Sequence, residues 1–496
     1  MKNFEFSKLK PKVQEFLDKE IPLYINGQYQ TASSNTSFDV LDPSTGKQIA
    51  IASEANENDV NLAVQAARNA FDNGEWTQMP AQKRSNILYE FARLLKEHRE
   101  ELAELESIDS GKVYETALAD DIDGTIQQFE YYAGFATQIS GKTTQISNDL
   151  VAYTLHEPIG VVGQIIPWNF PLLMASWKLG AALAVGCTIV IKPAMETPLS
   201  LLYAAQLFKE AGFPDGVVNI IPGPGRTVGE ALTNHTDVDK LAFTGSTAVG
   251  TGVMKNAAEQ IKNVTLELGG KSPAIVLNDA DLDETIEGVY NGTMYNHGQN
   301  CSACTRVYVQ RDIYDDVIEK LKARAATVQV GPSMDPNSDM GPLISERQQQ
   351  RVLEYIDKGK QEGAKLLCGG NKVHDAGYYV EPTIFVDVED DMTIAREEIF
   401  GPVMAVFVFD EVDEVINRAN DSEYGLASSV WTQNIKTGHY ISNKLKAGTV
   451  WINTVGQELE TMPFGGYKQS GIGREMGGEY GIQSYTEVKS VMINID

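Results

Sequence analysis

Two cysteines three positions apart, Cys301 and Cys304, are the residues of this sequence best suited to covalent chemistry. Their spacing fits a metal clamp, a dithiol redox pair, or one nucleophilic thiol with an unreactive neighbour. A structural zinc site needs four ligands and only His297 lies near the pair, so the sequence predicts no metal site. The dithiol and the single nucleophile stay open, together with a buried, inert cysteine.

A nucleophilic cysteine needs donors for a developing oxyanion, and a base if water attacks later. Two glycine-rich stretches, Gly223–Gly229 and Phe243–Gly250, are candidates for binding a cofactor beside it. The second lies between an apolar run and a helical one, an arrangement in which the start of a helix binds pyrophosphate. No Gly-Lys-Ser/Thr follows, so an ATP-type loop is not supported, and a plain turn capped by Ser246 is the alternative.

The composition limits the class of protein. A chain of 496 residues indicates two or three domains, and its formal charge of -27 argues against binding nucleic acid or a membrane surface. The most apolar stretch, 159–191, is interrupted by Pro167 and Lys178, which indicates buried strands and a helix and not a membrane span. Four cysteines without a secretory signal indicate a cytoplasmic protein.

Apolar periodicity predicts the elements that must position these groups. Residues 84–105 have apolar side chains at helical spacing. From Gly160 onward, short runs rich in valine and isoleucine alternate with helical stretches, which is typical of an α/β fold with a buried parallel sheet. These runs are GVVGQII, CTIVIKP, GVVNIIP, KLAFTG, VTLELG and PAIVLN.

Two kinds of boundary are predicted. The pair Gly269-Gly270 could form a hinge before a second α/β unit at about 272–464. The segments 139–156 and 484–495 are polar and partly alternating, which suits edge strands. Such strands could meet another subunit or cap the protein's own sheet, and the sequence leaves both open.

Six ordered motifs, spread over nearly the whole chain, are similar to those of one enzyme family. They are PWNFP (167–171), FTGS (243–246), LELGGKSP (266–273), GQNCSA (298–303), EEIFGPV (397–403) and PFGGYKQSGIGRE (463–475). With these motifs the sequence resembles the NAD(P)-dependent, non-phosphorylating, hydrolytic aldehyde dehydrogenases. The resemblance implies a Rossmann-type NAD(P)-binding domain at 1–138 and 157–266, an α/β catalytic domain at 267–470, and a small β oligomerisation element at 139–156 and 480–496.

The resemblance implies a role for five catalytic residues. Cys301 would be the nucleophile, and the Asn169 amide and the Cys301 backbone N–H would bind the oxyanion. Glu267 would activate water, with a pKa raised by partial burial, where a plain alternative is a strand glutamate paired with Lys271. Glu475 and Lys178 would lie on a proton exit path, and a surface salt bridge for each is the alternative. Cys304 would then be a bystander.

The resemblance also implies ten cofactor-binding residues. They are Ile166, Trp168, Lys192, Gly225, Gly245, Ser246, Gly250, Leu268, Glu398 and Phe400. Among them Ser246 and Gly245 would hold the pyrophosphate and Glu398 the nicotinamide ribose. The sequence departs from the family pattern at Met195-Glu196, where the acidic residue that favours NAD is displaced by one position. NAD with tolerance for NADP is therefore expected.

Positions that line the aldehyde tunnel in the family are mostly apolar and aromatic here. They are Phe170, Leu173, Met174, Trp177, Tyr295, Asn300, Ser302 and Phe464. They suit an aliphatic or aromatic aldehyde, and rings could also surround a quaternary ammonium such as that of betaine aldehyde. Glu458 and Glu460, in a segment expected at the tunnel mouth, are expected to be solvated.

The expected activity is oxidation of a small aldehyde to the carboxylate by a homo-oligomer, a dimer or a tetramer. A coenzyme A-acylating enzyme is the nearest alternative, although a base at Glu267 favours hydrolysis. A catalytically idle protein with this fold is an alternative of a different class. A thiol-disulfide oxidoreductase is a third, and it requires Cys304 as well as Cys301.

Overall fold

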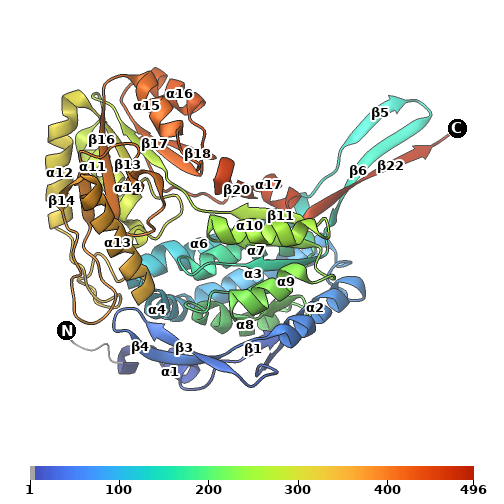
Figure 1. The fold of residues 1–496 in the computed structure, drawn as a ribbon. Coiled ribbons are helices and arrows are strands. Elements are labelled where there is room, and N and C mark those ends of the chain that lie inside the picture. The colour runs from blue at the N-terminus through green and yellow to red at the C-terminus, as the bar shows by residue number, and fades with distance from the viewer. Residues whose placement is uncertain (1–5) are drawn as a thin grey trace.

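The computed structural model describes residues 6–496 as two α/β bodies and a projecting strand arm (Figure 1). Residues 1–5, which the sequence assigns to the cofactor-binding domain, lie outside the described residues. The first body is built on an eight-stranded sheet, parallel from β9 to β11 and closed at both edges by antiparallel strands. Its order is β2 (Gln28–Gln30), β1 (Leu23–Ile25), β9 (Val218–Ile220), β8 (Thr188–Lys192), β7 (Val161–Ile165), β10 (Lys240–Thr244), β11 (Asn263–Glu267) and β20 (Gly471–Ile472).

The second body contains a seven-stranded sheet, and the chain passes from one sheet to the other between Glu267 and Pro273, across the predicted hinge glycines. The order is β14 (Lys365–Cys368), β15 (Thr383–Val386), β16 (Val403–Phe409), β13 (Arg306–Gln310), β12 (Pro273–Val276), β17 (Ala427–Trp431) and β18 (Thr449–Ile452). All six predicted runs are strands, five in the first sheet and PAIVLN in the second. The predicted α/β architecture is confirmed.

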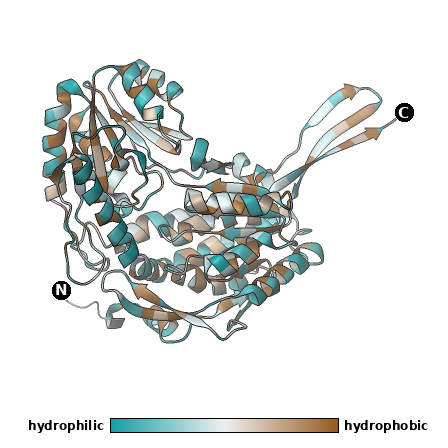
Figure 2. Cartoon of the chain, viewed as in Figure 1, coloured by the Kyte–Doolittle hydropathy of each residue, from teal (hydrophilic) through white to brown (hydrophobic). Residues whose placement is uncertain are grey.

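Helices cover both sheets, and most of them turn polar faces outward (Figure 2). In the first body they are α1 (Pro11–Leu17), α2 (Glu57–Asp72), α3 (Ala81–Glu97), α4 (Arg99–Ser110), α5 (Tyr114–Thr116), α6 (Asp123–Phe135), α7 (Pro171–Val185), α8 (Leu199–Ala211), α9 (Glu230–Asn234) and α10 (Thr247–Ala258). The remaining helices are α11 (Leu282–Met294), α12 (Tyr314–Ala326), α13 (Glu346–Glu362), α14 (Thr393–Arg396), α15 (Val412–Asn420), α16 (Ile435–Lys444) and α17 (Glu479–Gln483).

The single helix predicted over 84–105 is wrong, because α3 ends and α4 begins at His98. The His98 backbone leaves the helical region at φ -104° and ψ 15°, while its N–H still bonds to the carbonyl oxygens of Leu94 and Leu95. Glu100 and Glu101 then stand in the first turn of α4, where acidic side chains favour a new helix start. The apolar pattern continues across the break, which is why periodicity does not reveal it.

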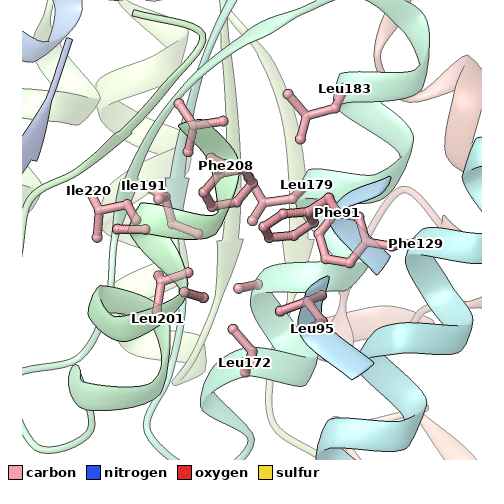
Figure 3. Close-up of a cluster of buried hydrophobic side chains, with 14 of the residues drawn as sticks. Phe91, Leu95, Phe129, Leu172, Leu179, Leu183, Ile191, Leu201, Phe208 and Ile220 are labelled. Atoms are coloured by element: carbon pink, nitrogen blue, oxygen red, sulfur yellow. The ribbon is translucent and has the colours of Figure 1, made fainter. Parts of the chain in front are cut away.

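A core of packed rings and aliphatic side chains fixes α7 against the sheet (Figure 3). Phe91 stacks on Phe208 with ring centroids 4.1 Å apart and meets Phe129 edge-on at 4.8 Å. Leu172 and Leu179 of α7 belong to the same cluster. Close packing of this kind leaves α7 little freedom to shift, so the residues at its N-terminus have fixed positions.

The two polar segments form an arm that projects from the first body and carries the C-terminus (Figure 1). Segment 139–156 is a hairpin of β5 (Thr143–Ser147) and β6 (Leu150–Pro158), not one strand, and β22 (Thr486–Asn494) pairs along the other edge of β6. The strands make their own sheet and do not cap either large sheet. Two smaller pairs, β3 (Ser37–Asp42) with β4 (Lys47–Ser53) and β19 (Pro463–Phe464) with β21 (Glu475–Met476), complete the strands.

Candidate active site

Cys301 lies in a turn between the 3-10 helix Tyr295–Gly298 and strand β13. Two residues of that helix, Asn296 and His297, have left-handed backbones with φ of 49° and 59°. Such conformations cost about 1–3 kcal/mol each and persist only where the surroundings impose them. Here the Nε2 of buried His297 accepts a hydrogen bond from the Gly341 N–H at 2.9 Å. The turn that presents Cys301 is therefore strained, and the hydrogen bond between Gly341 and His297 helps to keep it in place.

Asn169 brings the first body to this turn. It follows β7 and directly precedes the start of α7, and its side chain is buried. Its Nδ2 donates to the Gln299 carbonyl at 2.9 Å, and Asn296 Nδ2 donates to the Asn169 carbonyl at 2.8 Å. A side-chain amide has two N–H donors, so Asn169 keeps a second one for another acceptor.

Glu267 is the last residue of β11 and is 4% exposed. Neither of its carboxylate oxygens has a hydrogen-bond partner in the described part of the chain, so it is not paired with Lys271 and that alternative is wrong. Burial, and then the charge of Glu475, raise the pKa of Glu267 well above its usual value. A buried carboxylate without partners and with a raised pKa can accept a proton from water near neutral pH.

Lys178 and Glu475 form a buried ion pair behind Glu267. Lys178 Nζ donates to both carboxylate oxygens of Glu475, at 2.6 and 2.8 Å, and to Thr244 Oγ1 at 2.7 Å. The two side chains are 0% and 1% exposed, so the alternative of surface salt bridges is wrong. The negative charge of Glu475 raises the pKa of Glu267, and the positive charge of Lys178 lowers it.

The surroundings of Cys301 oppose its ionisation. Burial contributes most, and the charges of Glu458, Glu398 and Glu267 add to it, so the pKa of Cys301 is raised well above its usual value. The sequence did not reveal that these three carboxylates gather near one thiol. A positive charge entering beside Cys301 would lower its pKa again.

Cys304 is buried behind this turn as a free cysteine. Its backbone N–H donates to the Gly292 carbonyl at 2.9 Å, and its Sγ lies 3.8 Å from the Ser302 carbonyl oxygen. Burial raises the pKa of Cys304 to about 12. These are the surroundings of an unreactive thiol.

A cavity of about 340 Å³ opens beside the cysteine, and both chain neighbours of Cys301 line it. Six of the predicted pocket residues line this cavity: Phe170, Leu173, Trp177, Tyr295, Asn300 and Ser302. Two do not, because Met174 packs into the core and Phe464 packs edge-on against Trp177 at 5.2 Å. Of the eight residues predicted to line a tunnel, six therefore lie on this cavity and two lie away from it.

Residues that the sequence did not point to complete the cavity wall. They are Ala119, Asp120, Gly124, Gln127, Gln128, Asn291, Gly292 and Met476, whereas Val455 and Gly456 belong to the segment 455–462 that was expected at the tunnel mouth. Asp120, Gly124 and Gln127 recur at helical spacing, which could have indicated one exposed helix face. The expected solvation of Glu458 is wrong, because its Oε1 accepts a hydrogen bond from Ser302 Oγ at 2.8 Å and burial raises its pKa to about 7.

The glycine pair after Glu267 has a steric reason. A Cβ at Gly269 would collide with the carboxylate of Glu398, and one at Gly270 would collide with the Cys301 carbonyl oxygen. The Gly270 N–H donates to Glu398 Oε1 at 3.0 Å. Burial raises the pKa of Glu398 to about 7. The pair therefore brings Glu398 and the cysteine turn against the end of β11.

Groups suited to a dinucleotide lie along the first sheet. Ser246 caps α10, whose first N–H groups could receive an anion, and a side chain at Gly225 would meet only open space. Lys192 Nζ donates to the carbonyls of Pro193 and Gly223 at 3.0 and 2.9 Å, which leaves one ammonium N–H of the three. These donors fit the phosphates and ribose of NAD.

The other expected cofactor residues surround these groups. The Ile166 N–H donates to the Lys192 carbonyl at 3.1 Å, and Trp168 meets Phe400 edge-on at 5.3 Å. Leu268 packs on Gly250, where a Cβ would collide with it, and Gly245 likewise leaves room for the ring of Phe243. All ten residues lie around the carboxyl ends of the parallel strands, the edge at which open α/β sheets bind ligands.

No group of three or more histidine, cysteine, aspartate or glutamate side chains in 6–496 could hold a metal ion. Within the same range, no helix has the length and apolar character to cross a membrane.

Comparisons with known proteins identify close relatives. The model of the family described as "Aldehyde dehydrogenase family" matches residues 29–491. The mitochondrial aldehyde dehydrogenase of Homo sapiens is 50% identical over 475 residues, which cover 95% of this chain and 92% of that one. The NAD+ complex of an aldehyde dehydrogenase from Bacillus cereus has a TM-score of 0.98 at 58% identity and covers 99% of both chains. A betaine aldehyde dehydrogenase from Staphylococcus aureus has a TM-score of 0.95 at 39% identity, covering 98% of this chain and 96% of the other.

Proposed function

The chain belongs to the aldehyde dehydrogenase family, and we propose that it oxidises an aldehyde to the carboxylic acid through a thioester on Cys301, with NAD+ as hydride acceptor. One observation carries this proposal. A thiol, an amide donor and an unpartnered carboxylate come together from three separate parts of the fold: Asn169 bonds to Gln299 in the cysteine turn, and the charge of Glu267 acts on Cys301. The NAD+ complex of the Bacillus cereus relative supports the choice of cofactor.

In the first half of the reaction, the Cys301 thiolate adds to the aldehyde carbon and the carbonyl oxygen becomes an alkoxide. The free Asn169 N–H and the Cys301 backbone N–H, which has no acceptor among the described residues, would donate to this oxygen. One such donor is typically worth about 3 kcal/mol of transition-state stabilisation. NAD+, when bound, supplies the acceptor for the hydride that leaves the thiohemiacetal carbon, and a thioester remains on Cys301.

In the second half, water hydrolyses the thioester. Glu267 takes one proton from the water as it attacks the thioester carbon, the C–S bond breaks, and the carboxylic acid leaves while Cys301 is restored as the thiolate. The absence of a partner on either Glu267 oxygen supports this role, because no bond has to break before water can approach. The buried pair of Lys178 and Glu475 stands where it could receive that proton from Glu267.

The test is to trap the intermediate and identify the modified sulfur. Mass spectrometry of acid-quenched turnover mixtures should find the acyl group on Cys301 in the wild type. Cys301→Ser should lose at least ~10⁴-fold in activity, as removal of a covalent nucleophile does, and Cys304→Ser should keep near-normal activity. An unmodified Cys301 during turnover, or equal loss in both variants, would overturn the mechanism.

The competing fates of the thioester are separated by the same assay. Added coenzyme A should leave the carboxylic acid as the product. Formation of an acyl-coenzyme A would instead assign the chain to the acylating enzymes. Absence of NADH across a panel of aldehydes would point to a catalytically idle protein.

Cofactor choice follows from residues beside Lys192. Met195 carries no charge to repel a 2′-phosphate, and Glu196 lies near enough to Lys192 for its charge to act on that ammonium. NAD preference with measurable activity on NADP follows. A comparison of kcat/KM for the two cofactors measures it.

The arm supports a homo-oligomer, a dimer or a tetramer. We place this assembly in the cytoplasm. Val151, Leu155, Val488 and Met492 are large apolar side chains that stand exposed on β6 and β22. Burial of such a surface by another subunit would remove apolar area from water. Size-exclusion chromatography with light scattering, applied to the wild type and to Met492→Asp, would report the assembly and its dependence on the arm.

A further inference from the structure

Glu458 occupies an unusual place for a carboxylate, in the wall of the cavity beside the reactive thiol. It lies on the segment between β18 and β19, and its Oε1 accepts a hydrogen bond from Ser302 Oγ at 2.8 Å. Ser302 directly follows Cys301. The second oxygen of Glu458 has no hydrogen-bond partner among the described residues. One face of this carboxylate is therefore left for a ligand.

The charge of the cavity is one-sided. Its lining includes Asp120, Glu458 and Glu460, and none of the described residues in that lining is a lysine or an arginine. Lys112 lies behind this lining, but it is buried, ion-paired with Asp121 and placed 4.0 Å from the centre of the Phe170 ring. Lys112 is thus already engaged, and the cavity keeps a negative potential.

A neutral aliphatic aldehyde would gain nothing from Glu458. Filling the cavity with an apolar tail removes water from a carboxylate that has one hydrogen bond, and desolvation of a polar group without new partners is costly. A cationic tail would instead replace that water with an ion pair. Phe170 already has Lys112 over its ring and stacks on Tyr295, but the aromatic side chains of Tyr295 and Trp177 in the cavity wall also favour a cation.

We propose that Glu458 is a specificity-determining residue that selects aldehydes carrying a positively charged amino or ammonium group on a short chain. The proposal rests on the proposed function, with the aldehyde carbon at Cys301 and the cation beside Glu458. Binding of such a substrate also acts on the nucleophile. Glu458 is the largest charge contribution that raises the pKa of Cys301, and a cation beside Glu458 cancels that contribution. The correct substrate thereby favours the thiolate that attacks it.

The experiment uses two aldehydes that differ only in charge. In 3-(trimethylammonio)propanal a quaternary nitrogen stands where 4,4-dimethylpentanal has a carbon, so the two have nearly the same shape. Initial rates of NADH formation by the purified wild-type enzyme give kcat/KM for each. The wild type should prefer the cationic aldehyde by at least ~10-fold, the ratio expected of one favourable charge pair.

Removal of the charge should abolish the preference. Glu458→Gln keeps an acceptor for Ser302 and should lower kcat/KM for the cationic aldehyde by about 10–100-fold, while activity on the neutral one stays equal or rises. Glu319→Gln, which removes an exposed charge on α12 outside the cavity lining, is the matched control and should keep the wild-type ratio.

Each other outcome overturns the proposal in a recognisable way. A wild-type enzyme with no preference for the cation refutes it without any variant. An equal loss on both aldehydes in Glu458→Gln makes the residue structural. A failure of every aldehyde to yield NADH defeats the proposed function as well. A kcat/KM for the neutral aldehyde that equals the value for the cationic one defeats only the selectivity.

Discussion

Carboxylates are buried in two regions of this molecule, beneath α7 and α8 and around Cys301, and they have different partners. In the first region, Glu106 of α4 accepts a hydrogen bond from the Leu172 N–H at 3.3 Å, and Asp109 accepts one from the Leu199 N–H at 3.0 Å. Each therefore satisfies a free N–H in the first turn of a buried helix. Glu106 and Asp109 therefore stabilise the fold.

In the second region the carboxylates lie around the reactive thiol and accept no hydrogen bond from the start of a helix. Glu267 has no partner on either oxygen, and Glu398 and Glu458 have one hydrogen bond each. None of these three is paired with a cation in the described structure. They stand where a ribose, a water or a substrate could complete their bonding.

The comparison teaches that burial alone does not identify a working carboxylate. Burial raises the pKa of Glu106 and of Glu267 alike, well above the usual value. The two residues differ in how many carboxylate oxygens lack a hydrogen-bond partner and in what those oxygens face. Glu106 uses one oxygen to cap a helix, whereas Glu267 has no partner on either oxygen and lies near enough to Cys301 for its charge to act on that thiol.

The same substitution in both regions is the strongest test of this difference. Glu267→Gln should lower kcat by about 10²–10⁴-fold, because a general base contributes that much. Hydride transfer does not need this base, so a rapid burst of NADH should precede the slow steady state. Glu106→Gln keeps an acceptor for the Leu172 N–H and should leave kcat near the wild-type value. Stopped-flow absorbance at 340 nm measures both phases, and equal losses in the two variants would refute the distinction.

A smaller loss is expected at the oxyanion donor. Asn169→Ala should lower kcat by about 10²–10³-fold, the effect of removing one such donor. Because Asn169 also bonds to Gln299 through the same amide, melting temperatures must be compared alongside rates. A variant that melts normally and turns over normally would remove Asn169 from the mechanism.

Glu475→Gln should move the pH profile more than the maximal rate. Glu267 acts as a base when deprotonated, so thioester hydrolysis fails as pH falls through the pKa of Glu267. The charge of Glu475 raises this pKa, and its removal leaves Lys178 to lower it further. The acidic limb of the kcat profile should therefore shift to lower pH. Glu479→Gln, on the short helix α17, is the control, and an unmoved or upward shift in Glu475→Gln would contradict the coupling.

Local patterns predicted much of the fold. The six runs rich in valine and isoleucine are strands because strands buried on both faces need such residues along their whole length. The break at His98 was missed because the apolar spacing of α3 continues into α4, with neither glycine nor proline between them. The arm was found as strands, but its separate sheet depends on β6 pairing with β22 more than 300 residues away, which no local pattern encodes.

The sequence predicted which residues form the site but not how they are arranged in space. The motifs name Cys301, Asn169 and Glu267, and the structure brings the three parts of the chain together. The missing bonds of Glu267 and the turn of Glu458 toward Ser302 depend on packing between distant segments. The wall contributed by Asp120, Gly124 and Gln127 is likewise formed only when α6 and the π-helical turn before it, Ala117–Ile122, dock against the cysteine turn.

The smallest expected effect tests the scaffold side of the comparison, through stability alone. Burial raises the pKa of Asp109 well above its usual value, so the folded protein holds this proton more tightly than the unfolded chain does. The contribution of Asp109 to stability is therefore complete below about pH 4, the unfolded pKa, and is lost as pH rises through the folded pKa. Asp109→Asn can still accept the Leu199 N–H but does not titrate, so its melting temperature relative to the wild type should rise with pH while kcat is unchanged. Thermal scans at one heating rate from acid to neutral pH, with the exposed Asp375→Asn as control, measure this difference. A pH-independent difference would mean that Asp109 is as free to ionise in the fold as in water, and a fall in kcat would place this acid with those around Cys301.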